Sequence, residues 1–266
     1  MGSTDAIRNF WQNRWTGENA TASDLLADRF TKIAYRRIVG FFDARDRRIL
    51  EVGCGTGRFC GLVAKEYPNS DVIGIDVAAS ALRIADRLKD SLRVPNVQFV
   101  EGSVFSLPFS DNHFDVVFSE GVICCFDIGD LNNYVDAFDE MVRVVKPGGK
   151  LIVSLPNWYC FPHTLYKWWL RKLEVPYEYG YEKSFTRKEV GDLFRRHKFQ
   201  DFELTGFYPS YGFFRLASRL EARIGRFAKI FRFFGNVVDK LDFDWMSRVI
   251  GFQIIGKGVK PPERAA

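Results

Sequence analysis

Three glycines, each separated by one residue, lie in a short segment that could hold an anionic ligand. The segment Glu51-Val52-Gly53-Cys54-Gly55-Thr56-Gly57-Arg58 follows an apolar run and precedes a helical pattern. Glycines let the backbone turn tightly and approach a ligand without a Cβ clash, and the helix N-terminus offers free N–H groups to an anion. Neither the dinucleotide fingerprint nor the P-loop fits, because Arg58 replaces the third fingerprint glycine and no Gly-Lys-Ser/Thr follows.

An acidic residue follows at a distance typical of nucleoside-binding sites. Asp76 lies near the end of the second apolar run, nineteen residues beyond Gly57. A carboxylate at such a strand end can accept hydrogen bonds from both hydroxyls of a ribose, which indicates a nucleoside-containing cofactor. The alternative is a glycine turn with an unrelated surface aspartate, and the strand patterns on both sides disfavour it.

The elements that must position these residues are short strands alternating with helices from residue 48 onward. Strands are predicted at 48–53, 71–77, 97–102, 114–119, 150–155, 202–207 and 252–257, and helices at 59–66, 80–92, 131–145 and 187–197. The strand runs are apolar at both alternations, as in strands covered on both faces. This alternation predicts an α/β fold with a doubly wound, mostly parallel sheet.

Three segments lie outside the alternation. The predicted organisation is an N-terminal helical segment at 1–47, with one leading helix at 20–42, and a core at 48–207 and 251–260. An aromatic loop is expected at 158–185. The segment 208–250 separates the last two strands by about forty residues, where a hairpin needs only a few, so it is predicted to be a helical insertion.

Four segments together resemble a known family. They are ILEVGCGTG (49–57), VIGID (72–76), EGSVFSLPFSDNHFDVV (101–117) and EMVRVVKPGGKLIVSLPN (140–157). In their order and spacing the chain resembles the class I S-adenosylmethionine-dependent methyltransferases that act on small molecules. The resemblance implies a Rossmann-like seven-stranded sheet whose last strand is antiparallel, and S-adenosylmethionine as the cofactor.

The resemblance also implies which residues bind that cofactor. The methionine end would be wrapped by Glu51, Gly53, Cys54, Gly55 and Gly57. Asp76 would hold the ribose, with Val77 beside the adenine. Ser103 stands where many relatives have an aspartate for the adenine amino group, so backbone groups near Ser103 and Val104 are an alternative. Glu120 is expected to line the same pocket.

Methyl transfer from a sulfonium requires alignment of the reacting atoms and exclusion of water, and needs a base only when the acceptor keeps its proton. His163 is the predicted base, because it follows the fifth strand at the edge where open α/β sheets bind ligands. An ordinary loop histidine is the alternative. The residues expected to contact the substrate are Cys124, Cys125, Trp158, Tyr159 and Tyr211. The two cysteines could equally be small core-facing residues.

The acceptor is predicted from the second half of the chain. Of the 42 aromatic residues, 25 lie between Trp158 and Phe252. Within the insertion, a basic face flanks an apolar face of one helical pattern: Arg215, Arg219, Arg223, Arg226 and Lys229. Such a helix can cap a hydrophobic pocket or contact a membrane, here through 213–234. Alternatively, its apolar face packs on the domain and its arginines are solvated.

Composition excludes several classes. A net charge of +5, 27% charged and 47% hydrophobic residues fit a globular protein rather than a disordered one. Five cysteines without C-x-x-C spacing and three histidines predict neither a disulfide framework nor a metal site. Without a signal-peptide pattern or a spanning apolar run, the expected location is cytoplasmic or at the membrane periphery.

The sequence therefore predicts a methyltransferase that acts on a hydrophobic or amphipathic small molecule, with oxygen as the acceptor atom. A lipid, a quinone-like ring, a polyketide or an aglycone would fit. Nucleic acid is not an expected partner, because no RNA-binding module is visible. An RNA- or protein-modifying methyltransferase and a non-catalytic, cofactor-binding regulator are the alternatives, and nothing in the sequence indicates the oligomeric state.

Overall fold

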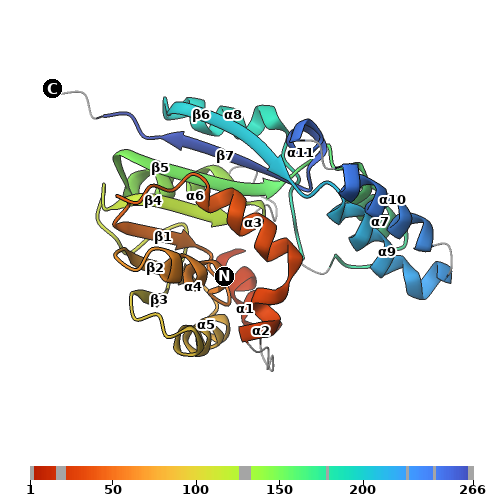
Figure 1. Cartoon of the computed structure of the whole chain (residues 1–266), viewed down its shortest axis with the longest axis horizontal. Coiled ribbons are helices and arrows are strands. Elements are labelled where there is room, and N and C mark those ends of the chain that lie inside the picture. The colour runs from red at the N-terminus through yellow and green to blue at the C-terminus, as the bar shows by residue number, and fades with distance from the viewer. Residues whose placement is uncertain are drawn as a thin grey trace.

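Seven strands form one sheet in the order β3-β2-β1-β4-β5-β7-β6 (Figure 1). They are β1 (Arg48–Val52), β2 (Asp71–Asp76), β3 (Val97–Glu101), β4 (Phe114–Glu120), β5 (Val145–Pro156), β6 (Gln200–Phe207) and β7 (Gln253–Val259). The computed structural model describes residues 3–15, 22–125, 133–177, 180–225, 228–241 and 244–262. All seven predicted strands are present, with bounds shifted by a few residues.

The sheet is parallel from β3 to β5 and antiparallel at β7. β7 pairs antiparallel with β5, from Lys150↔Val259 to Pro156↔Gln253, and with β6. This confirms the predicted doubly wound sheet with an antiparallel last strand. The chain order reverses between β1 and β4, which pair in parallel. In open α/β sheets, ligands bind in the crevice beyond the carboxyl ends of the strands at such a reversal.

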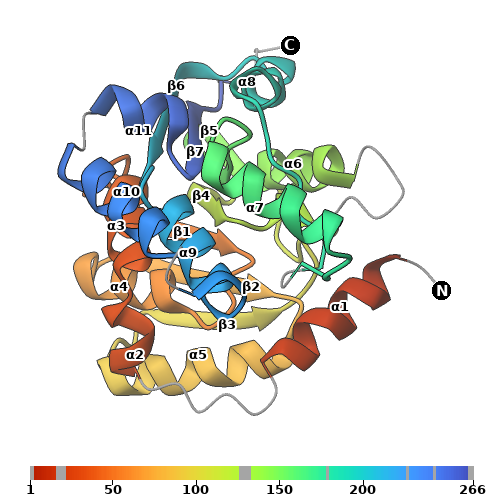
Figure 2. The ribbon, with the colours of Figure 1, turned by 90° about the vertical axis from the view of Figure 1, so that its right-hand side faces the viewer.

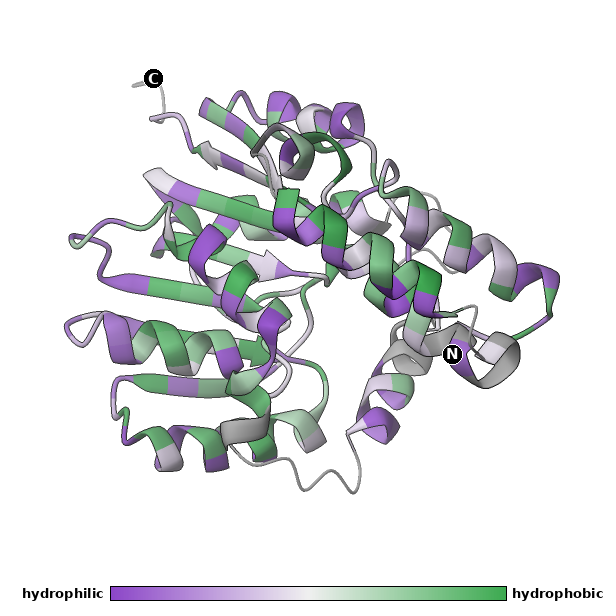
Figure 3. Cartoon of the chain, turned by 45° about the vertical axis from the view of Figure 1, so that its right-hand side comes forward, coloured by the Kyte–Doolittle hydropathy of each residue, from purple (hydrophilic) through white to green (hydrophobic). Residues whose placement is uncertain are grey.

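Helices cover both faces of the sheet. On one face, α3 (Arg29–Val39), α4 (Arg58–Glu66) and α5 (Ala79–Leu92) bury Ile38, Phe59 and Leu82 against the strands. On the other, α6 (Asn133–Val144) and α8 (Arg187–Arg196) bury Phe138 and Phe194. The strands are largely hydrophobic (Figure 3), as burial on both faces requires.

The leading helix predicted at 20–42 is wrong as a single element. The structure has α1 (Ser3–Arg14), α2 (Ala22–Ala27) and α3 in the N-terminal segment. Asp28 separates α2 from α3, because its carboxylate accepts a hydrogen bond from the Thr31 N–H at 2.8 Å and caps α3. α1 is tied to α5 by the Ser80 hydroxyl, which donates to the Gln12 carbonyl at 2.8 Å.

The aromatic loop predicted at 158–185 is also corrected, since much of it is the helix α7 (Phe161–Lys172). Pro162 lies in its first turn, where a missing N–H costs nothing. The helical insertion is present as α9 (Tyr211–Ile224), α10 (Ala228–Leu241) and α11 (Asp244–Ile250). Helices α7, α9 and α10 lie together at the carboxyl edge of the parallel strands (Figure 2).

Candidate active site

A cavity of about 450 Å³ opens at the carboxyl edge of the parallel strands. Its walls come from the loop after β1, from the ends of β2 and β4, and from residues 102–105 after β3. The N-terminal segment, α9 and the start of β7 close it. The cavity therefore lies at the reversal of strand order, where open α/β sheets bind their ligands.

The glycine loop forms one end of the cavity. Gly53 and Cys54 donate their N–H groups to the Ile75 carbonyl at 2.7 and 3.0 Å, which binds the loop to β2. Gly53 has a φ of +72°, and a Cβ there would lie 2.2 Å from a Val122 methyl carbon. Gly55 faces open space. Gly53, Cys54 and Gly55 line the cavity, so the backbone can approach a ligand as the sequence predicts.

Gly57 has a different role from the predicted ligand contact. It does not line the cavity but caps α4 with a φ of +72°. A Cβ there would lie 2.6 Å from the Phe99 ring and 2.7 Å from the Ala85 side chain. This glycine is therefore required by close packing of the loop on α5 and β3.

Asp76 lines the cavity beside the glycine loop. Its two carboxylate oxygens accept hydrogen bonds from the backbone N–H groups of Gly55 (2.8 Å) and Ala78 (2.9 Å). Burial raises the pKa of this carboxyl, and the backbone donors oppose the shift. Each oxygen keeps a further lone pair, so the held carboxylate can still accept ribose hydroxyls. Val77, Ser103 and Val104 line the adjoining wall.

Glu51 lines the cavity from β1, next to the loop. Its Oε2 accepts hydrogen bonds from the Cys60 N–H at 3.0 Å and the Cys60 thiol at 2.8 Å. Burial raises the pKa of Glu51 to about 8. All of the residues predicted to bind the cofactor, apart from Gly57, thus meet at this cavity: Glu51, Gly53, Cys54, Gly55, Asp76, Val77, Ser103, Val104 and Glu120.

The predicted substrate residues separate into two groups. Cys125 and Tyr211 line the cavity. Cys124 is buried behind it, with its sulfur 3.7 Å from that of Cys125. Trp158 and Tyr159 are 54% and 51% exposed and do not line the cavity. The structure therefore contradicts the latter two, because α7 begins at Phe161 and the turn before it faces solvent.

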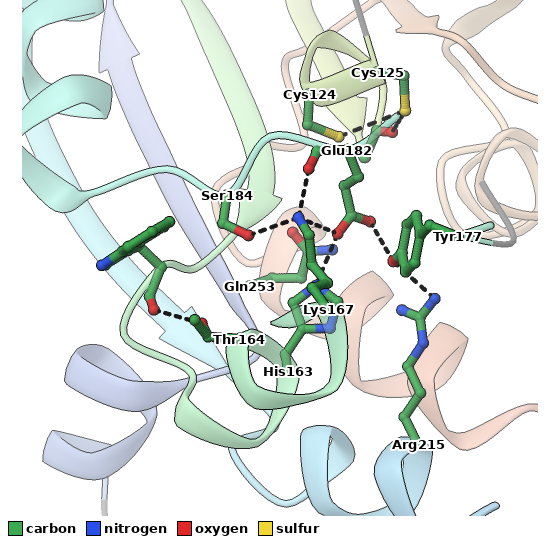
Figure 4. Close-up of polar contacts among 12 residues, drawn as sticks. Cys124, Cys125, His163, Thr164, Lys167, Tyr177, Glu182, Ser184, Arg215 and Gln253 are labelled. Carbon is green, nitrogen blue, oxygen red and sulfur yellow. Dashed lines mark hydrogen bonds and ion pairs between the residues drawn. The ribbon is translucent and has the colours of Figure 1, made fainter. Parts of the chain in front are cut away.

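His163 does not reach the cavity either. It is fully buried in α7, and its Nε2 lies 2.7 Å from Oε1 of Glu182, which does line the cavity (Figure 4). Burial lowers the pKa of His163, although the Glu182 carboxylate opposes the shift, and Nε2 is the ring atom that faces that carboxylate. The predicted role as a base that contacts the acceptor is therefore wrong, and His163 positions Glu182 instead.

Glu182 lines the cavity from the segment between α7 and α8, and the sequence did not indicate it. Besides His163, its carboxylate accepts from the Tyr177 hydroxyl at 3.0 Å and pairs with Lys167 Nζ at 3.5 Å. Burial opposes its ionisation, but the His163 hydrogen bond and the Lys167 and Arg215 charges lower its pKa to about 2. A glutamate in a loop carries no sequence pattern that reveals such partners.

The position of Arg215 differs from the predicted solvent-facing basic face of the helix. Instead of facing outward, it is 9% exposed, lines the cavity and donates to the Tyr177 hydroxyl at 2.9 Å. Its guanidinium lies 5.4–5.8 Å from the ring centres of Tyr166, Tyr177 and Phe252. The side chains of Arg219 and Arg223, and all of Arg226, lie outside the described residues, whereas Lys229 is exposed.

Further cavity residues come from the N-terminal segment, which the sequence did not connect with the site. They are Trp11, Arg14 and Trp15 at the end of α1, with Leu25, Asp28 and Phe30. Only the tertiary structure brings them over the sheet edge. In the described ranges, no group of three His, Cys, Asp or Glu side chains is arranged to hold a metal ion.

The strand order, the glycine loop and the acid at the end of β2 define a Rossmann-like fold with a nucleoside-cofactor site. Residues 43–191 match the family model described as a methyltransferase domain. Because this match covers more than half of the chain, the protein belongs to the S-adenosylmethionine-dependent class I methyltransferases.

Two curated relatives carry the sequence similarity. The ubiquinone/menaquinone biosynthesis C-methyltransferase UbiE of Ectopseudomonas mendocina is 39% identical over 111 residues, which are 40% of each chain. The demethylmenaquinone methyltransferase of a Geobacillus species is 26% identical over 61% of this chain and 75% of its own. The chain thus matches less than half of the UbiE relative's length. Both relatives are named as methyltransferases, and neither name supports oxygen as the acceptor atom.

A solved structure shows the same fold. The geranyl diphosphate C-methyltransferase of Streptomyces coelicolor, in complex with Mg²⁺, geranyl diphosphate and S-adenosyl-L-homocysteine, superposes with a TM-score of 0.61. It covers 98% of both chains at 14% identity, so the likeness concerns the fold alone.

Proposed function

We propose that the protein transfers a methyl group from S-adenosylmethionine to a ring carbon of a lipophilic acceptor, with a hydroxylated, quinol-like ring as the substrate class. The observation that carries this proposal is a single cavity with two unlike ends. The glycine loop and Asp76 line one end, and Trp11, Phe30, Tyr211 and Phe252 bring rings to the other walls.

The residues at the cofactor end fit S-adenosylmethionine. The turn at Gly53 and Gly55 leaves backbone close to the cavity, and the Asp76 carboxylate is held toward it by two N–H groups. Bound there, the cofactor supplies a methyl group already activated by its sulfonium. The chain's task is then to orient the acceptor and exclude water, for which the rings around the cavity are suited.

We propose carbon rather than oxygen as the acceptor atom because of the names of the two relatives. The UbiE relative is named a C-methyltransferase, and the Geobacillus relative is named for demethylmenaquinone. An RNA acceptor is less suited, since Arg215, which the sequence placed on an outer basic face, is turned into the cavity. A protein acceptor has no specific observation in its favour.

The test is direct methylation. The protein is incubated with labelled S-adenosylmethionine and a reduced, isoprenoid-tailed demethylmenaquinone, with total lipid and RNA as parallel acceptors. The product is analysed by mass spectrometry and NMR, which separate a ring-bound methyl from a methyl ether. Label in the quinol fraction as a ring methyl supports the proposal; a methyl ether, or label only in RNA, contradicts it.

We further propose that the protein contacts a lipid membrane, where such acceptors reside. Exposed large apolar side chains occur on three helices of the second half of the chain: Phe161 and Trp168 of α7, Ile230, Phe233 and Phe234 of α10, and Trp245 and Val249 of α11. We call these seven residues the apolar edge. Exposed basic residues accompany it on the same helices: Arg171, Lys172, Lys229, Arg232, Lys240 and Arg248. Rings with flanking basic charges suit an anionic lipid interface.

Within the described ranges, none of the helices is both long and apolar enough to cross a bilayer. The predicted contact segment, 213–234, spans α9 and the first half of α10; α9 packs against both α7 and α10, so the proposed contact rests on exposed residues of α7, α10 and α11.

A further inference from the structure

Five carboxylic acids line the cavity, and four of them have an evident structural role. Asp28 caps α3, Glu51 binds Cys60, Asp76 holds the glycine loop, and Glu182 accepts from His163 and Tyr177. The fifth, Glu120, has a single hydrogen-bond donor among the described residues, the Gln253 Nε2 at 3.3 Å. Its carboxylate therefore keeps most of its capacity to accept hydrogen bonds.

Glu120 is well placed to meet both reactants. It ends β4, where the chain turns at Gly121 with a φ of +69°, and it pairs with Ser154 across the sheet. β4 adjoins β1, whose loop forms the cofactor end, and Gln253 belongs to β7 on the acceptor side. The carboxylate thus lies between the two ends of the cavity.

The charges facing Glu120 leave it able to hold or release a proton. Withdrawal from solvent raises its pKa to about 7; Arg58 opposes the shift, and the Glu182 and Asp28 carboxylates add to it. No lysine or arginine of the described ranges forms a salt bridge with it. A carboxylate with a pKa near the working pH is the most effective type of general base.

Gln253 supplies a second, independent observation. It is 4% exposed and lines the cavity, and its Oε1 has no hydrogen-bond partner among the described residues. Buried amide oxygens nearly always have a donor, so this atom is suited to one that a ligand brings. With Nε2 on Glu120 and Oε1 unpaired, the amide can hold the carboxylate and bind the acceptor together.

We propose that Glu120 and Gln253 form the polar subsite of the acceptor cavity, in which Glu120 takes the proton of a ring hydroxyl and Gln253 positions it. This inference rests on the proposed carbon methylation. Loss of the hydroxyl proton to Glu120 raises electron density at the neighbouring ring carbon. That carbon forms the new bond to the methyl group while the methyl–sulfur bond breaks, and its electron pair stays on sulfur.

The remaining proton transfers balance the reaction. The methylated ring carbon loses its hydrogen as a proton, which restores the aromatic ring, and the ring oxygen regains a proton from Glu120. One proton is released to solvent for each methyl group transferred. Glu120 ends as a carboxylate, ready for the next acceptor, and no oxidant or metal ion is required.

The first experiment measures binding without the cofactor. 1-Naphthol carries a hydroxyl on a two-ring skeleton, and 1-methoxynaphthalene is its matched control because it lacks the donor. For the wild type, we expect calorimetry to show 1-naphthol binding about tenfold tighter at pH 8 than at pH 6, since an ionised acceptor makes the stronger hydrogen bond. In Glu120→Gln this tenfold difference should disappear, and 1-methoxynaphthalene measures with either protein the pH dependence that other cavity groups such as Glu51 cause.

The second experiment measures turnover. Glu120→Gln should lower kcat about 10²–10⁴-fold, as loss of a general base does. Glu174→Gln, an exposed carboxyl remote from the cavity lining, is the control. If Glu120→Gln does not fold, Glu120→Asp keeps the carboxylate on a shorter side chain and should lower kcat while preserving the pH dependence of 1-naphthol binding.

The outcomes separate this inference from the proposed function. Wild-type 1-naphthol affinity that is independent of pH, or full turnover by Glu120→Gln, overturns the subsite. If the wild type binds 1-naphthol with the expected pH dependence but does not methylate the quinol, the subsite holds and the proposed acceptor fails.

Discussion

The ribose assignment of Asp76 can be tested with Asp76→Asn, a substitution of nearly equal size. In the structure both carboxylate oxygens face backbone N–H groups, those of Gly55 and Ala78. An asparagine has one oxygen and one NH₂ group, so one of these donors would face another donor. The glycine loop would lose part of its link to β2, and a ribose hydroxyl would lose a charged acceptor.

The expected magnitude follows from these contacts. A hydrogen bond from a ribose hydroxyl to a charged group contributes about 1.5–3 kcal/mol, and weakening of the hydrogen bond from the second ribose hydroxyl adds up to about 1 kcal/mol. The total of about 1.5–4 kcal/mol corresponds to roughly 10- to 1,000-fold weaker cofactor binding. The donor conflict in the loop should also lower the free energy of unfolding, by about 1–3 kcal/mol.

Isothermal calorimetry with S-adenosylmethionine measures the first effect, and denaturant unfolding without ligand measures the second. Asp71→Asn is the matched control, because Asp71 is the exposed first residue of the same strand, at the opposite edge of the sheet. Wild-type cofactor affinity in Asp76→Asn would refute the ribose assignment, whatever happened to stability. Weak binding by both variants would mean that charge on β2, rather than this contact, is responsible.

The remaining predictions concern the loop, the buried ion pair and the surface. Gly57→Ala should lower the free energy of unfolding by about 1–3 kcal/mol through strain and crowding against Phe99, with Gly148→Ala, which has open space, as the control for positive φ. Equal losses in both would show that packing is not the cause. Glu182→Gln should lower the free energy of unfolding by about 3–5 kcal/mol near pH 7. The reason is that the charges of Lys167 and Arg215 would stay largely buried after the carboxylate beside them is neutralised. Because the pKa of Glu182 is lower in the folded than in the unfolded protein, this stabilisation is present above the unfolded pKa and is lost as the pH falls toward 2. Equal free energies of unfolding for wild type and variant at pH 7 would contradict this prediction. Phe233→Ser combined with Trp245→Ser should reduce sedimentation with anionic vesicles several-fold, while Phe10→Ser, on α1, should not. Absence of vesicle binding by the wild type would end the membrane proposal.

Local pattern and spacing were sufficient for the fold and most of the cofactor end. Runs such as those of β1 and β2 are apolar on both alternations because the strands are covered on both faces. Gly53 and Gly55 were recognised because a positive φ and a close backbone approach restrict the residue type. Gly57 shows the limit of this reasoning, since the same residue type serves packing there rather than a ligand.

The acceptor end was predicted less well, because its residues come from segments far apart in the chain. His163 lies behind Glu182, and Trp158 and Tyr159 face solvent. Arg215 has the helical spacing of a solvated residue, yet it lies over three rings in the cavity. A helical wheel gives the positions of side chains around the helix axis, but it does not show which side of the helix faces the core.

The sequence by itself determined the seven strands, the glycine loop and the acid at the end of β2, because these depend on backbone conformation and on contacts between neighbours in the sheet. Only the tertiary structure decided which cavity carboxylates already accept several hydrogen bonds from the protein and which one can accept them from a ligand. Glu51, Asp76, Glu120 and Glu182 are alike as residue types, and their roles differ through donors brought from other elements. Hydrogen bonding and desolvation act over a few ångströms in space, irrespective of separation along the chain.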